Sequence, residues 1–175
     1  RAIEAEMIRI IPDLSDAKRK EVLKYMNLIC DKVQPADARY IAFRNGIYDV
    51  VTDTMQDFSP NIVMTNKIPW DFNSAAFSEL ADHTLNRLAC DDPAIRSLLE
   101  ECIGYCFYRR NELGKAFILT GDKNNGKSTF LEVVKAILHD SNISALDAKE
   151  LGDRFTTSMM FGKLANIGDD ISDDF

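Results

Sequence analysis

The sequence contains no apolar run that approaches the ~20 residues a helix needs to cross a bilayer, and no secretory signal peptide opens it. It has only two histidines, and its four cysteines (Cys30, Cys90, Cys102 and Cys106) form no CxxC pair. This pattern favours reduced, buried thiols over a disulfide framework, although Cys102 and Cys106 have a helical spacing that suits packing as well as a metal. We therefore expect a cytoplasmic protein that does not bind membranes.

Basic residues are in deficit, because 21 Lys and Arg face 28 Asp and Glu, which gives a net charge of -7. An acidic domain binds nucleic acid poorly without sequence specificity, since such binding depends on neutralising phosphates, although a local basic site is not excluded. The 175 residues suffice for one domain or two small ones. The first residue is Arg1 rather than Met, so we expect the chain to be a fragment of a longer protein.

The first 110 residues predict helices and one small sheet. Apolar residues recur with helical spacing over 2–11, 16–30, 75–89 and 94–108. Ser15 can cap the second of these helices, and Pro93 fits the first turn of the last. Residues 40–58 predict a β-meander with turns at "RNG" and "TDT", where turn formation is the expected role of Asn45 and Gly46. We expect Trp70 to anchor the core.

The remaining residues predict an α/β unit. "RRNELG" at 109–114 is typical of a hinge, so we place a domain boundary between 1–110 and 111–175. A buried strand is expected over 115–120, a helix over 128–138, and further strands over 142–148 and 163–170. The predicted fold class is therefore mixed α/β, with a helical region and β-meander followed by a βαβ-type unit.

The stretch "GDKNNGKS" at 121–128 matches the phosphate-loop pattern G-x-x-x-x-G-K-S between an expected strand and an expected helix. Its two glycines permit backbone angles that let the N–H groups form an anion nest, to which the helix N-terminus adds positive charge. Lys127 can reach the β- and γ-phosphates, and Ser128 can bind Mg²⁺. The residues predicted to bind nucleotide are Gly121, Asp122, Lys123, Asn124, Asn125, Gly126, Lys127, Ser128 and Thr129, among which Lys123 is expected to face solvent.

A phosphate loop needs acidic partners, and "KLANIGDDISDDF" at 163–175 offers them. Asp169 is predicted to bind Mg²⁺ through water, and Asp170 to polarise the attacking water. Asp173 and Asp174 provide a second candidate pair. An acidic, solvated tail without a role in the site is the remaining alternative.

Several ordered segments together resemble the primase-helicase proteins of phages, plasmids and poxviruses, whose motors belong to helicase superfamily 3 of the AAA+ P-loop ATPases. "IAFRNGIYDV" followed by "FSP" is similar to the family's pre-helicase region, and "LLEECIGYCF" to the helix that leads into the motor. "AFILTGDKNNGKSTFL" resembles its phosphate loop, and "GDRFTTSMMFGKLANIGDDIS" the approach to its acidic strand.

The resemblance implies a pre-helicase collar over 1–110 and the N-terminal part of an AAA+ motor over 111–175, truncated after the acidic strand. It implies ATP and Mg²⁺ as cofactors, with Lys127 and Asp170 in catalysis and Ser128 and Asp169 at the metal. The full-length protein would be a ring-forming homo-oligomer, expected to be a hexamer, that unwinds DNA in a bacterial host cytoplasm. Its DNA-contacting parts would lie outside this chain.

Two alternatives stay open at this stage. The chain could be an assembly or adaptor module, or a prophage remnant, that binds nucleotide without turnover. A small-molecule or nucleoside kinase would need an arginine-rich lid, and the only arginine after the loop is Arg154, which argues against it.

Overall fold

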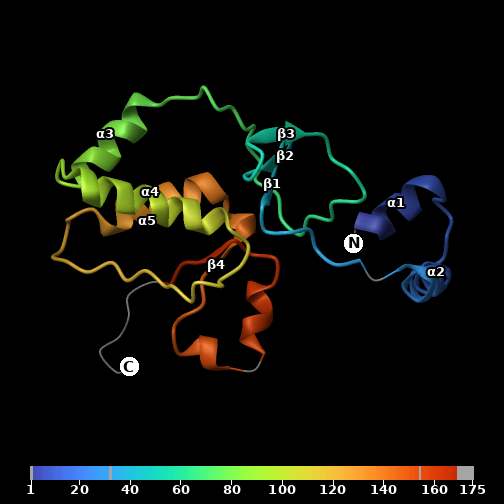
Figure 1. Cartoon of the computed structure of the whole chain (residues 1–175). Helices are drawn as coiled ribbons and strands as arrows, with labels where there is room; N and C mark the ends of the chain where they lie inside the picture. The colour runs from blue at the N-terminus through green and yellow to red at the C-terminus, as the bar shows by residue number, and fades with distance from the viewer. Residues whose placement is uncertain (1, 32, 154, 169–175) are drawn as a thin grey trace. The chain divides into compact units, whose positions relative to one another are not determined.

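The computed structural model describes residues 2–31, 33–153 and 155–168 (Figure 1). The chain divides into two compact units, Arg1–Gln34 and Pro35–Phe175. Among the described residues, no helix combines the length and the apolarity that crossing a membrane requires. The molecule is of mixed α/β class, with helices and a small antiparallel sheet.

The first unit consists of α1 (Ala2–Ile10) and α2 (Asp16–Ile29). Ser15 caps α2 as predicted, because its side chain accepts a hydrogen bond from the amide of Lys18. None of the residues of α2 is buried. Both helices therefore expose apolar side chains, which include Ile3, Ile8, Val22, Tyr25, Leu28 and Ile29.

The predicted β-meander is confirmed as β1 (Tyr40–Phe43), β2 (Gly46–Asp49) and β3 (Thr54–Gln56), paired in that order and antiparallel. Its buried apolar residues are Ala42 and Ile47. The amide of Ile68, which is also buried, donates to the carbonyl oxygen of Ala42. Gly46 is required by a close approach, since a Cβ there would lie 2.7 Å from the carbonyl oxygen of Gln56. Asn45 does more than form the predicted turn. Its side chain exchanges two hydrogen bonds with the backbone of Phe72, at 2.9 and 3.0 Å, and so ties the hairpin to a distant segment.

Three helices share one core in the second unit: α3 (Glu79–Leu88), α4 (Pro93–Phe107) and α5 (Lys127–Leu138) (Figure 1). Its buried members are Leu85, Cys102, Phe130, Val134 and Leu138. Pro93 lies in the first turn of α4, as predicted. The helix expected over 75–89 begins later than predicted, because Ser78 caps it at Glu79. Phe77 and Leu80, two apolar residues of the predicted range, are each 78% exposed.

The second sheet is small and parallel. It contains only β4 (Ile143–Ser144) and β5 (Ala165–Asn166) among the described residues, which fall within the two later predicted strands. Short 3-10 helices at Asp140–Asn142, Glu150–Gly152 and Thr156–Met160 occupy the chain before and between them. Residues Phe155 and Phe161 beside the last of these are more than four-fifths exposed.

The prediction of a buried strand over 115–120 is wrong. This segment has no strand pairing in the described part of the chain, and Phe117 and Ile118 are 47% and 68% exposed. Leu119 alone packs against the core of α3, α4 and α5. A short apolar run becomes a strand only where a neighbouring strand satisfies its backbone groups, and β4 and β5 pair with each other instead.

The predicted domain boundary at 110/111 lies inside the second unit. Arg109, in the expected hinge, donates to the carbonyl oxygens of Ala36 and Asp37. Leu85 and Cys102, before the boundary, share a core with Phe130, after it. The division into 1–110 and 111–175 as separate domains stays a prediction.

Candidate functional site

Three residues with positive φ shape the segment from 121 to 126. They are Gly121 at 144°, Asn124 at 61° and Gly126 at 95°. Asparagine is among the few residues that enter the left-handed region at low cost. A Cβ at Gly121 would lie only 2.0 Å from Nδ2 of Asn125, so a larger residue would displace that side chain. The pattern of glycines and asparagines therefore encodes a tight loop that turns back on itself.

Gly126 forms the junction between this loop and α5. Its carbonyl oxygen accepts the first helical hydrogen bond, from the amide of Phe130 at 2.9 Å. A Cβ at Gly126 would lie 2.3 Å from Cδ2 of Leu88, on α3. No side-chain cap closes the start of α5 among the residues that the structure describes. The first amides of a helix carry partial positive charge and suit an anion such as phosphate.

The ammonium group of Lys127 lies over the loop. Its Nζ donates to the carbonyl oxygens of Gly121 at 2.7 Å and Asp122 at 2.8 Å, and to Oδ1 of Asn125 at 3.1 Å. These acceptors are neutral, and hydrogen bonds from an ammonium to a charged phosphate oxygen are stronger. An anion that enters the loop could therefore replace these oxygens as the hydrogen-bond acceptors of Lys127.

The other predicted loop residues are exposed: Asp122, Lys123, Ser128 and Thr129. Ser128 and Thr129 lie in the first turn of α5, so the Ser128 hydroxyl is accessible to a hydrated cation. The chemistry of this site fits a nucleotide phosphate, since glycines provide the space that a Cβ would fill and a lysine provides the charge.

The predicted acidic residues Asp169 and Asp170 lie outside the described residues, as do the alternatives Asp173 and Asp174. The last described residue before them, Gly168, follows β5 by two positions. No cluster of three or more His, Cys, Asp or Glu that could hold a metal occurs within 2–31, 33–153 and 155–168. Ser128 is thus the one predicted metal ligand whose position the structure describes.

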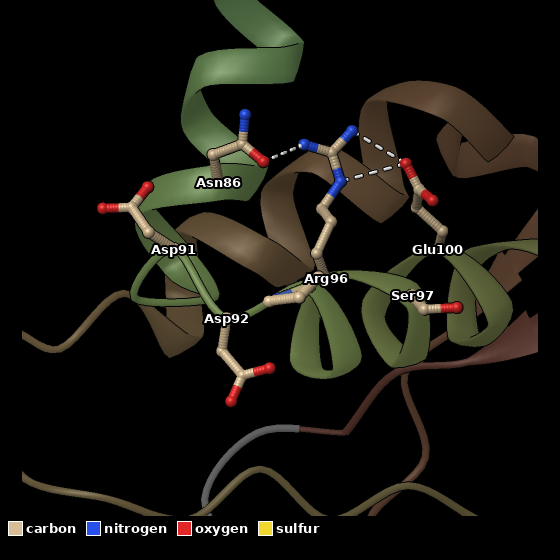
Figure 2. Close-up of a pocket in the computed structure, with 7 residues that line it drawn as sticks. Asn86, Asp91, Asp92, Arg96, Ser97 and Glu100 are labelled. Carbon is tan, nitrogen blue, oxygen red and sulfur yellow. Dashed lines mark hydrogen bonds and ion pairs between the residues drawn. The ribbon is translucent and has the colours of Figure 1, made fainter.

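A separate surface depression lies between α3 and α4 and not at the loop (Figure 2). Arg96 crosses it, donating to Oδ1 of Asn86 at 2.7 Å and pairing with Glu100 at 2.7 Å and Asp82 at 3.1 Å. With its donors taken by residues of α3 and α4, Arg96 joins the two helices. The depression is therefore explained by helix packing.

The cysteines differ from the prediction of four buried thiols. All four are free, but Cys30 and Cys90 are exposed. Cys102 is buried, and Sγ of the half-buried Cys106 donates to the carbonyl oxygen of Cys102 at 3.3 Å. Burial is the main cause that raises the pKa of the Cys106 thiol to about 11. Among the described residues, the pair belongs to no group of three or more side chains that could hold a metal, so packing is the better account.

The sequence did not predict two residues that contact the start and the end of α5. Leu88 contacts Gly126, and Trp70 donates from its indole to the far end of the same helix. Helical spacing marks Leu88 only as apolar. Trp70 was expected in the core, yet it is 48% exposed. No local signal in the sequence connects either residue with the loop, because both contacts join distant segments.

Comparison with known families finds two matches along the chain. Residues 119–175 match a family of unknown function, DUF5906, and residues 1–104 match the family described as D5 N terminal like. A search of curated proteins finds no match. The second match covers more than half of the 175 residues and agrees with the resemblance of "IAFRNGIYDV" to a pre-helicase region. The chain therefore belongs to the D5 N terminal like family, the N-terminal region of phage- and plasmid-type primase-helicase proteins, which links it to replication.

Proposed function

We propose that the loop from Gly121 to Ser128 binds the phosphates of ATP together with Mg²⁺. The observation that carries this proposal is the position of Lys127, whose ammonium lies 2.7–3.1 Å from three oxygens of the loop. The open N-terminus of α5 and the positive φ at both glycines support it. These are the elements that a phosphate loop needs: a charge, amide donors and room for the anion.

In the longer protein, this loop would belong to a superfamily 3, AAA+ motor that couples ATP hydrolysis to DNA unwinding. Lys127 would neutralise phosphate charge, and Ser128 with Asp169 would hold Mg²⁺. Asp170 would orient the attacking water. A ring-shaped homo-oligomer, proposed to be a hexamer, would contact DNA through further parts of the protein. With Mg²⁺ held there, the charge that develops on the phosphates would be neutralised.

A titration of this chain with Mg²⁺ and ATP by isothermal calorimetry tests the binding step. Lys127→Ala should weaken binding about tenfold or more, because hydrogen bonds to charged groups contribute ~1.5–3 kcal/mol each. Lys149→Ala is the matched control, since this exposed lysine lies outside the loop. Equal affinity of Lys127→Ala and the wild-type chain would show that the loop is not the binding site.

One observation favours a second candidate, a module that binds nucleotide without turnover. The segment 115–120, which leads into the loop, is exposed except at Leu119 and lacks strand partners among the described residues. A phosphate loop on an unsupported segment is less rigid, and catalysis depends on preorganised donors. Phosphate release by the longer protein, measured with and without DNA, separates the two candidates. Turnover supports the motor, and binding without turnover supports the module.

A further inference from the structure

We propose that Leu88 positions the phosphate loop, and that nucleotide binding is thereby coupled to the packing of α3. This inference rests on the proposed function of the loop. Leu88 ends α3, and its Cδ2 occupies the space beside Gly126 where a side chain at that position would lie, 2.3 Å from an ideal Cβ. Leu88, from another helix, thus fills the space that a side chain at Gly126 would occupy.

The contact matters because Gly126 joins the loop to α5. Its φ of 95° is a conformation that glycine enters freely and also leaves freely. Packing against a fixed neighbour removes that freedom before a ligand arrives. Because binding must otherwise offset the entropy of ordering the loop, a preorganised junction between the loop and α5 raises affinity.

Leu88 is itself held in place by α3. The neighbouring Leu85 is 8% exposed and shares a core with Phe130, in the first turn of α5. Arg96 fixes α3 to α4 by donating to the side chain of Asn86 (Figure 2). It also bonds the backbone carbonyl oxygen and the carboxylate of Asp82. A shift of α3 would therefore move Leu88 relative to Gly126. By linkage, a nucleotide that orders the loop stabilises this packing to the same extent.

The test is a fluorescence titration of the chain with a Mg²⁺-bound, fluorescently labelled ATP, below the melting temperature of every variant. Leu88→Ala should raise Kd on the order of tenfold, within the range usual for coupling between sites. Leu88→Met should restore affinity, because leucine and methionine exchange with little change in volume. Leu80→Ala, on the same helix but 78% exposed, is the matched control. An unchanged Kd in Leu88→Ala, or an equal loss in Leu80→Ala, would overturn the proposal.

A second measurement needs no nucleotide. Gly126→Ala should lower Tm in the wild-type background, and it should lower Tm less in a Leu88→Ala background, where the added methyl group no longer meets Cδ2. Additive losses would show that Leu88 does not fix the loop. If the wild-type chain fails to bind the labelled ATP, the proposed function fails, and this cycle alone decides whether Leu88 positions the loop.

Discussion

The indole Nε1 of Trp70 donates to the carbonyl oxygen of Ala136 across 3.0 Å, and to that of Ile137 across 3.1 Å. These carbonyls belong to the last turn of α5, where a helix leaves its oxygens without partners. The side-chain amide of Asn142 donates to the next carbonyl, of Leu138, at 2.8 Å. The helix α5, which starts after the loop at 121–126, is therefore capped at its end by side chains from outside it.

Trp70→Phe keeps an aromatic ring and removes only the donor to α5. We expect the free energy of unfolding to fall by about 1 kcal/mol, the usual net contribution of a hydrogen bond. Urea denaturation followed by circular dichroism measures it. Asn142→Ala serves as a reference with a larger expected loss, because Asn142 is 3% exposed and also donates to the carbonyl of Lys67. Unaltered stability of Trp70→Phe would mean that water replaces the indole at no cost.

Asp49 should make stability depend on acid pH. A hydrogen bond from Arg39 is the main cause that lowers the pKa of Asp49 from 3.8 to about 2. Because its folded pKa is below its unfolded pKa, the carboxylate stabilises the fold above pH 4, and this stabilisation is lost as pH falls from 4 toward 2.

We expect Asp49→Asn to lower Tm by several degrees at pH 7, and to flatten the dependence of Tm on pH between 4 and 2. The exposed Asp57 offers a matched control, as Asp57→Asn removes a carboxylate from the same region. If Tm depends on pH in the same way in both variants, Asp49 is not the source of the acid dependence.

The two predicted acids should differ in effect if they hold the proposed roles. Asp170→Asn should preserve nucleotide binding and slow turnover in the longer protein about 10²-fold or more, as expected when a catalytic proton acceptor is lost. Asp169→Asn should instead raise the Mg²⁺ concentration needed for half-maximal turnover. Phosphate release over a Mg²⁺ series distinguishes them. A larger loss on changing Asp173 and Asp174 would assign the site to that pair.

Hydrogen exchange should separate the segment 115–120 from the helices. Its amides lack strand partners in the described chain, whereas the amides of α4 are bonded within a 15-residue helix. We expect exchange within seconds for 116–119 and much slower exchange for 98–106, since protection follows local opening. The strands β4 and β5, of two residues each, should fall between them. Protection of 116–119 equal to that of α4 in a monomer would reveal strand pairing that the described residues do not provide.

The sequence by itself determined the elements whose signals are local. Ser15 and Pro93 mark helix starts, "RNG" turns the first hairpin, and the glycines at 121 and 126 take positive φ. Each of these depends on a residue and its immediate neighbours in the chain, through a side-chain cap, a fixed φ or a missing Cβ. The fold class and the family resemblance could be predicted for the same reason.

The tertiary structure alone decided which segments meet. An apolar run at 115–120 satisfies the pattern of a strand, but a strand exists only with a partner, and β4 takes β5. Trp70 satisfies the pattern of a core residue, yet its indole caps α5, because only the folded chain brings it to open carbonyl groups. Leu88 and Gly126 are 38 positions apart in the sequence, and periodicity carries no information on contacts at that separation.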